Sequence, residues 1–210
     1  MNFRAELPVL PDLLELHRLR PQAYPFLLQS VAGHPQSGRY DILFAASAEI
    51  IRSSDTADFF GALAQIQQAP AAADPLPFTG GWFLLLGYEL AGQIEPRLRL
   101  PASPHALPDA IAVRCPAALV VDREARCTHL VAASKAQLDE LRHDLDSSFN
   151  KISQHTENIV ISSVEEDPPE RYLQGVEQIL DYLKAGDIFQ VNLSRGWRAQ
   201  LSPQVSYLDL

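Results

Sequence analysis

Apolar and polar positions follow two alternating periods along the chain, one typical of strands and one typical of helices. Tyr40–Phe44 alternates at first and then becomes continuously apolar, and Trp82–Leu86 is apolar throughout after two glycines. The first pattern predicts a strand, and the second predicts a strand buried on both faces. Ala110–Val121 and Arg126–Ala133 are rich in Val and Leu and flank a polar turn at 122–124, which predicts an antiparallel hairpin.

Two helices are predicted among these strands. Asp55 and Asp58 precede Phe59–Ile66, where apolar residues recur at helical spacing, so we expect a capped helix there. Ser134 is predicted to cap the second helix. Its apolar stripe, which we expect to pack on the sheet, consists of Leu138, Leu141, Leu145 and Phe149.

A third helix has the strongest boundary signals. Asp167, two prolines and Glu170 resemble a capping box at its start, and Gly186 is placed to end it. A strand is predicted next, because Phe189, Val191 and Leu193 alternate with Gln190, Asn192 and Ser194. Its amide-bearing face suits directed hydrogen bonding, or it is an ordinary polar face packed against water or another strand.

This mixture of periods predicts an α+β fold in which antiparallel sheets carry flanking helices. Residues 151–167 lose most of their periodicity and read as a linker or crossing segment. We therefore expect a domain boundary near residue 165, with one domain over residues 1–165 and the start of another over 166–210.

The amino-acid composition excludes several classes of protein. Of 210 residues 47% are apolar, enough for a buried core, and 17 basic against 26 acidic residues give a formal charge of −9. That charge argues against binding nucleic acid through its phosphates. No apolar run is long enough to span a membrane, and no signal peptide is visible, so we expect a cytoplasmic protein without membrane contacts.

The sequence offers no catalytic constellation and no metal site. Cys115 and Cys127 lack a metal-ligand spacing with the six histidines, and in the predicted hairpin residue 115 faces about 132 while 127 faces about 120. The cysteines are interpreted as unpaired buried thiols. The turn-like stretch 33–39 is either a mobile surface loop or a small carboxylate site, because Arg39 and free backbone N–H groups lie there.

Several segments of the sequence resemble those of a known enzyme family. Residues 182–195 closely resemble the start of the chorismate-binding domain in the family of anthranilate synthase component I and aminodeoxychorismate synthase component I. Other segments in the family's order are Leu27–Ser30, Gly38–Ile42, Gly80–Phe83 and Gly87–Leu90. The resemblance covers most of the chain, and implies that residues 1–165 form the family's N-terminal domain and 166–210 an incomplete chorismate-binding domain.

Two positions favour the aminodeoxychorismate synthase branch. Asn192 stands where anthranilate synthases often have an apolar residue, and Gln29 replaces the acid of the family's Leu-Leu-Glu-Ser element. The resemblance then implies conversion of chorismate and ammonia to 4-amino-4-deoxychorismate, on the route to 4-aminobenzoate and folate. A glutamine amidotransferase subunit would be the partner and Mg²⁺ the cofactor. The alternatives are an anthranilate synthase, for tryptophan biosynthesis, and a non-catalytic module that binds an amino acid or docks a partner.

The family's catalytic lysine, its acid/base glutamate and its magnesium ligands belong to motifs that this sequence does not contain. No catalytic or metal residue is therefore assigned here, we expect the chain alone to be inactive, and Asp209-Leu210 is expected to lie in mid-domain.

By resemblance, a pocket for a tryptophan-like amino acid is lined by Leu28, Ser30, Ser37, Gly38, Arg39 and Tyr40. Residues 170–201 are expected to expose an apolar face and to self-associate or be disordered.

Overall fold

The computed structural model describes residues 3–30, 38–66, 74–101, 103, 106–149, 159–203, 205 and 208. The chain divides into two compact units, Met1–Ser153 and Gln154–Leu210. The division falls before the boundary predicted near residue 165, because β9 (Ile161–Glu166) pairs with β10 (Trp197–Leu201) and so belongs to the second unit. Among the described residues, no helix combines the length and apolar character that crossing a membrane requires.

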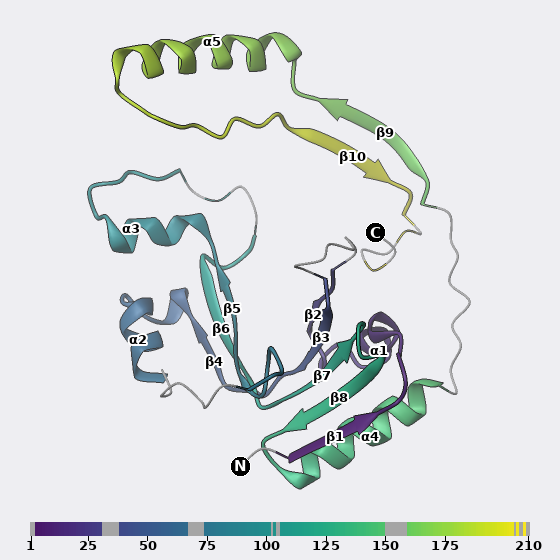
Figure 1. Ribbon diagram of the computed structural model, residues 1–210. Coiled ribbons are helices and arrows are strands. Elements are labelled where there is room, and N and C mark those ends of the chain that lie inside the picture. Colours follow the sequence, from purple (N-terminus) through teal and green to yellow (C-terminus); the bar gives the residue numbers. More distant parts are fainter. Residues whose placement is uncertain are drawn as a thin grey trace. The chain divides into compact units, whose positions relative to one another are not determined.

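The first unit is built on an antiparallel five-stranded sheet (Figure 1). The strand order is β1 (Phe3–Leu7), β8 (Cys127–Ala132), β7 (Ala117–Asp122), β3 (Tyr40–Ala45) and β2 (Phe26–Leu28). Strand β7 is buried along its whole length because it is central and covered on both faces. The predicted α+β class with antiparallel sheets is confirmed.

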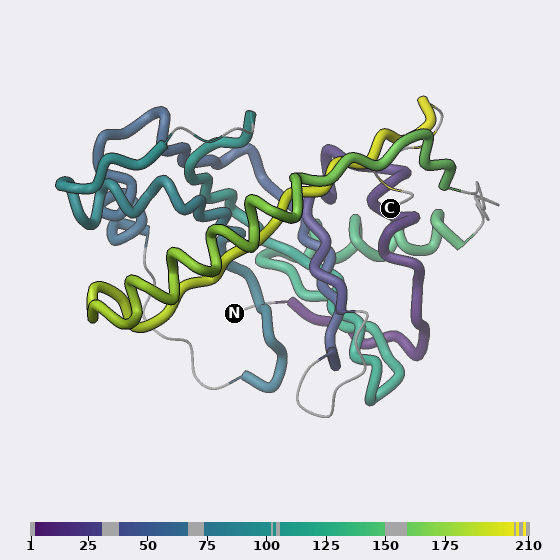
Figure 2. Tube along the Cα trace, turned by 90° about the horizontal axis from the view of Figure 1, so that it is seen from above, coloured from purple at the N-terminus to yellow at the C-terminus, as the bar shows by residue number. Residues whose placement is uncertain are grey.

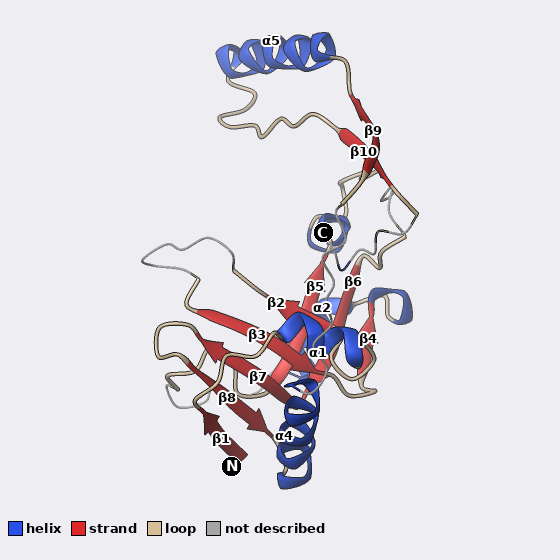
Figure 3. Ribbon diagram, turned by 90° about the vertical axis from the view of Figure 1, so that its right-hand side faces the viewer, coloured by secondary structure: helices blue, strands red, loops and turns tan. Residues whose placement is uncertain are grey.

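Two helices cover one face of this sheet, α1 (Leu13–Leu19) and α4 (Lys135–Phe149) (Figures 1 and 3). The buried residues that join helices and sheet include Leu13, Leu16, Leu43, Leu119, Leu130, Leu141 and Leu145. Both helices have N-terminal caps. The Asp12 carboxylate accepts backbone N–H bonds at the start of α1, and Ser134 and Gln137 bond reciprocally at the start of α4 as a capping box.

A second, three-stranded sheet has the order β4 (Ile50–Arg52), β6 (Ala110–Cys115) and β5 (Gly81–Leu86). The predicted single strand 110–121 is thus two strands in two sheets. Pro116 separates them, because it has no N–H to donate to a ladder. The helices of this region are α2 (Phe59–Ile66) and α3 (Ala91–Ile94), with 3-10 turns at Ser53–Asp55 and Tyr88–Leu90. The predicted helix at 59–66 is confirmed.

Aromatic rings pack on the other face of the five-stranded sheet. Phe26 and Phe83 stack with centroids 4.0 Å apart, and Phe44 meets Phe78 and Phe83 edge-on. The prediction that 82–86 is buried on both faces was wrong. Trp82 and Phe83 are only partly buried, and Leu84, Leu85 and Leu86 are 45%, 38% and 51% exposed, so neither face of β5 is fully covered.

The hairpin turn shifts the register from the predicted one. Four turn residues, 123–126, place Cys127 opposite Asp122 rather than residue 120, and Arg126 takes a left-handed backbone with φ 56°. Cys115 lies on β6, outside the hairpin strands, and packs against Val120 of β7 and Val131 of β8. Both cysteines are buried and unpaired, as predicted.

The second unit contains one long helix, α5 (Pro169–Ala185), and the antiparallel pair β9–β10. Gly186 ends α5 with φ 80°, and the Asp187 N–H donates to the Tyr182 carbonyl oxygen, as predicted for a glycine cap. The cap residue at the start of α5 is Pro168. The predicted cap, Asp167, instead accepts a hydrogen bond from the Gly196 N–H at 3.1 Å.

The chain after α5 runs back along the helix (Figure 2), and Leu193 lies against Gly175. Residues 190–196 form no ladder with other described residues, so the strand predicted at 189–194 is not present as a paired strand. Its apolar side chains find no core in this unit: Phe189, Val191 and Leu193 are 95%, 42% and 39% exposed. No residue of α5 is buried either.

Candidate functional site

A pocket of about 530 Å³ opens on the face of the five-stranded sheet opposite α1 and α4. Its polar lining consists of Arg4, Glu6, Arg39, Tyr40, Asp122, Cys127 and His129. The register explains this gathering. Tyr40, Asp122 and Cys127 lie opposite one another on three adjacent strands, and Glu6 lies opposite His129 in the next row.

Arg39 is held by Asp122. Its Nε lies 3.1 Å from both carboxylate oxygens, and Nη2 donates to Oδ2 at 2.7 Å. Asp122 is buried and also accepts the N–H groups of Glu124 and Ala125 at 3.0 Å. The Arg39 guanidinium holds the pKa of Asp122 below its usual value. The Arg39 guanidinium, which was predicted to bind the carboxylate of a ligand, is therefore already paired with the carboxylate of Asp122.

A second ion pair lies beside the first. The Asp41 carboxylate accepts from Arg123 Nε at 2.8 Å and Nη2 at 2.7 Å. Its other oxygen accepts the Ser30 N–H at 3.1 Å, which fixes the chain after β2. The two crossed Arg–Asp pairs join β3 to the hairpin turn.

The residues predicted to form an amino-acid pocket separate into two groups. Arg39 and Tyr40 line the 530 Å³ pocket, where the Arg39 Cζ lies 4.8 Å from the Tyr40 ring centroid. Leu28, Ser30 and Gly38 are not among its lining residues, and Leu28 is 51% exposed at the end of β2. Ser37 lies outside the described residues. Two of the six predicted residues thus line this pocket, and the amino-acid site itself stays a prediction.

The same pocket holds a cluster of potential metal ligands that was not predicted from the sequence. Cys127 Sγ lies 3.4 Å from His129 Nε2, and Glu6 Oε2 lies 3.5 Å from His129 Nδ1. The sequence-based expectation that the cysteines lack a metal-ligand spacing with the histidines did not foresee that Cys127 and His129 lie this close together. The signal was present in the sequence: residues two apart on a strand share a face.

Burial sets the protonation of both thiols. It raises the pKa of Cys127, and the neighbouring carboxylates of Glu6 and Asp122 raise it further. Burial likewise raises the pKa of Cys115 to about 11. Both cysteines are therefore thiols at neutral pH, and neither is a thiolate nucleophile.

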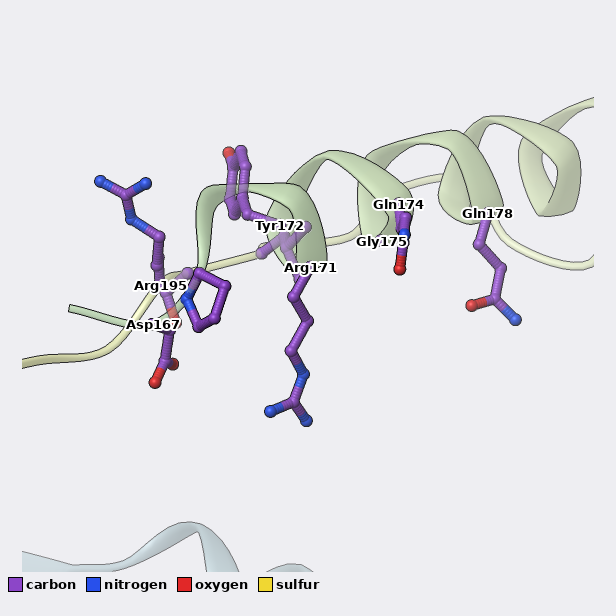
Figure 4. A pocket seen from close by; sticks show the side chains of 10 residues that line it. Asp167, Arg171, Tyr172, Gln174, Gly175, Gln178 and Arg195 are labelled. Atoms are coloured by element: carbon purple, nitrogen blue, oxygen red, sulfur yellow. The ribbon is translucent and has the colours of Figure 1, made fainter.

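The second unit has a pocket of its own, of about 470 Å³, between the start of α5 and residues 193–195 (Figure 4). The side chains of Asp167, Arg171 and Gln178 extend to the same side of the helix. Arg195 donates to Glu166 at 2.8 Å, and its Cζ lies 5.0 Å from the Trp197 ring centroid. Amide and guanidinium donors thus predominate along this wall, which suits a ligand that accepts hydrogen bonds.

Comparison with known proteins places these features in a family context. The sequence profile described as chorismate binding enzyme matches residues 24–209. Anthranilate synthase component 1 of Synechocystis sp. is 26% identical over 83% of this chain and 43% of its own length. Aminodeoxychorismate synthase component 1 of Escherichia coli is 27% identical over 88% of this chain and 44% of its own length. The chain thus spans less than half the length of these curated relatives.

Among solved structures, anthranilate synthase component I from Streptococcus pneumoniae has the same fold. It superimposes with a TM-score of 0.62 over 92% of this chain and 48% of its own length, at 18% sequence identity.

Proposed function

The chain belongs to the family of chorismate binding enzymes, and we propose that it is the amino-terminal part of component I of an aminodeoxychorismate synthase. In this proposal the whole enzyme converts chorismate and ammonia to 4-amino-4-deoxychorismate. The ammonia is supplied by a glutamine amidotransferase subunit. The observation that carries the proposal is the profile match over residues 24–209.

The choice between the two branches of the family depends on two side chains. Asn192 stands in the segment Gln190–Leu193 that follows α5, and Gln29 replaces an acid in the segment before β3. Both favour aminodeoxychorismate over anthranilate as the product. The relatives include both kinds of synthase at similar identity, so anthranilate synthase is the second candidate.

We place the chemistry of the proposed reaction outside these 210 residues. The Pro-Ile-Lys-Gly-Thr motif that carries the family's catalytic lysine does not occur in the sequence. Mg²⁺ prefers an all-oxygen ligand set, whereas among the described residues the three-ligand group that the structure brings together, Glu6, Cys127 and His129, includes a thiol. The described residues therefore do not fit the magnesium site that the family implies.

In the proposal, this chain contributes the face on which the rest of the chorismate-binding domain packs. Helix α5 leaves Leu173 and Leu180 59% and 49% exposed, and Trp197 on β10 is 60% exposed. Apolar surface of this extent is typical of an interface rather than of a free surface. Self-association of the 210-residue chain through this face stays a prediction.

The proposal extends to an amino-acid site in the first unit, near Leu28, Ser30, Gly38, Arg39 and Tyr40. Because Asp122 already neutralises Arg39, we expect this unit alone to bind a tryptophan carboxylate weakly. Calorimetric titration of the chain with tryptophan should show no micromolar affinity. Micromolar binding would show that the first unit forms a complete site.

Chimeric enzymes test the proposed function. Residues 1–210 are joined to the remaining part of the E. coli aminodeoxychorismate synthase component 1, or to that of the Synechocystis anthranilate synthase component 1. The expected result is ammonia-dependent conversion of chorismate by the first chimera at a rate at least about tenfold above the second, each measured against its parent enzyme. Higher relative activity of the second chimera would favour the anthranilate branch. The unfused chain, as a control, should form neither product.

A further inference from the structure

We propose that Cys127, His129 and Glu6 form a binding site for a thiophilic divalent cation of the Zn²⁺ type in the first unit. This inference is independent of the proposed synthase function. The three residues lie on two adjacent antiparallel strands, β8 and β1 (Figure 1). Their potential ligand atoms all lie within 4.8 Å of one another.

The strand geometry arranges the ligands before any ion arrives. Cys127 and His129 are two residues apart on β8 and so share a face, and Glu6 is the direct partner of His129 on β1. All three belong to a paired sheet whose opposite face is covered by α1 and α4. Ligands on such rigid elements are better positioned than ligands on loops.

The distance between the first two ligand atoms fits tetrahedral coordination. Zn–S bonds of about 2.3 Å and Zn–N bonds of about 2.0–2.1 Å at a tetrahedral angle place S and N about 3.6 Å apart. Cys127 Sγ and His129 Nε2 are 3.4 Å apart. An ion bound to both therefore requires only a small adjustment of these two side chains.

Glu6 completes a three-residue set. Its Oε2 lies 3.5 Å from His129 Nδ1, whereas Cys127 faces the other ring nitrogen, Nε2. The Glu6 side chain is 67% exposed, so its carboxylate is free to turn from Nδ1 to the Nε2 side, where it would reach the ion. All three residues line the 530 Å³ pocket, so a water molecule would have room to supply the fourth ligand. Three protein ligands with one open position are a frequent arrangement for Zn²⁺.

The local charge favours a cation. Arg4 and Arg39 also line the pocket, but each is paired, with Asp74 and with Asp122. Glu6 adds a carboxylate beside the thiol without a guanidinium partner among the described residues. Binding converts the Cys127 thiol to a thiolate: the S–H bond breaks, the proton leaves to solvent, and the sulfur electron pair forms the bond to the metal.

The donor set identifies the class of metal. Thiolate and imidazole ligands favour Zn²⁺ and similar ions, whereas Mg²⁺ and Ca²⁺ require oxygen ligands. The site is thus distinct in chemistry from the magnesium site that the family implies.

Cobalt(II) is the probe for the experiment, because a thiolate–cobalt bond gives a charge-transfer absorption band. The reduced, metal-free 210-residue chain is titrated with Co²⁺ and then with Zn²⁺. We expect one equivalent of Co²⁺ to bind with a thiolate band, Zn²⁺ to displace it, and excess Mg²⁺ to leave it unchanged. The absence of the band, or displacement by Mg²⁺, would overturn the proposal.

The two cysteines provide a matched pair of variants. Cys115→Ser should keep the band and the wild-type affinity, because Cys115 belongs neither to the ligand cluster nor to the lining of the pocket. Cys127→Ser should lose the band and weaken Zn²⁺ binding at least about tenfold. If Cys127→Ser fails to fold, His129→Gln and Glu6→Gln provide the same test through affinity. Wild-type affinity in Cys127→Ser or in His129→Gln would contradict the site.

Discussion

Strand pairs β7–β8 and β9–β10 are both antiparallel, yet they occupy opposite extremes of burial. Every residue of β7 is buried, whereas every residue of β9 is exposed. The ladders themselves are similar, with each strand six residues or five residues long. The difference is what lies on the faces: α4 and the aromatic cluster cover the first pair, and no described element packs on the second to a comparable extent. A two-stranded ladder without a covered face is marginally stable in water.

The same contrast holds for the two long helices. In α4, Leu138, Leu141 and Leu145 are buried against the sheet. In the corresponding apolar stripe of α5 no residue is buried: Val176 and Ile179 are half-buried and the others are exposed, although α5 has a good glycine cap and a longer span. Local sequence signals therefore suffice to form α5, while tertiary packing, which gives most of the stability of a helix in a protein, is present only for α4.

The largest expected effect compares a leucine from each helix. Leu145→Ala in α4 removes a fully buried side chain and should lower the free energy of unfolding by about 2–5 kcal/mol. Leu173→Ala in α5, where the side chain is 59% exposed, should change it by less than about 0.5 kcal/mol. Urea denaturation followed by circular dichroism measures both. Equal effects would mean that α5 has a core of its own.

The next comparison concerns the arginine–carboxylate pairs. Asp122→Ala removes a buried carboxylate that holds Arg39 and two backbone N–H groups, and should cost about 2 kcal/mol. Glu166→Ala breaks the partly exposed pair with Arg195 and should cost less than about 1 kcal/mol. Asp122→Asn serves as the control, because its amide oxygen still accepts the two N–H groups, and thermal unfolding should place it between the wild type and Asp122→Ala.

A smaller effect is expected at the end of α5. Gly186 has φ 80°, so Gly186→Ala forces a side chain into the left-handed region at a cost of about 1 kcal/mol. The loss should appear as reduced helical signal from α5, with the unfolding midpoint of the first unit unchanged. Gly92→Ala in α3 is the matched control and should be close to neutral, because Gly92 has no positive φ and an added Cβ would make only an ordinary contact with Leu100 at 4.0 Å. A shift of the main unfolding midpoint by Gly186→Ala would indicate that the two units unfold together.

The smallest expected effect on stability is that of acid, which should destabilise the first unit by protonating Asp122. Because Arg39 lowers the folded-state pKa of Asp122, its contribution to stability is complete above the unfolded pKa of about 3.9 and is lost as pH falls through the lower, folded value. The wild type should therefore lose stability below about pH 4 more steeply than Asp122→Asn. Equal slopes for the two proteins in acid unfolding would contradict this assignment.

The sequence predicted the elements well where local signals act. Residue type alone predicts the serine cap of α4 and the glycine at the end of α5. The alternation of apolar and polar residues predicts the strand that the structure shows at residues 40–45. The division of 110–121 at Pro116 was also visible as a proline inside a strand pattern, but the period on both sides was the same, so the pattern alone did not show two sheets.

Features that depend on pairing between distant segments were not predictable from one sequence. The order of the five strands places Glu6 beside His129, more than a hundred residues later in the chain, and no local pattern contains that register. Arg39 was expected to be available to a ligand because its partner, Asp122, lies on another strand. The exposure of residues 189–193 followed from the family resemblance, since the alternating pattern alone predicts a paired strand.

Hydrogen exchange of the intact chain tests the central contrast most directly. The amides of β7 and β8 should exchange only through global unfolding, whereas those of α5, β9 and β10 should exchange at least about a hundredfold faster, through local opening of an uncovered segment. Mass spectrometry of peptides from 117–132 and 161–201, at low protein concentration, measures both sets in one sample. Equal protection of the two sets would contradict the account, because it would show that the second unit is as well packed as the first.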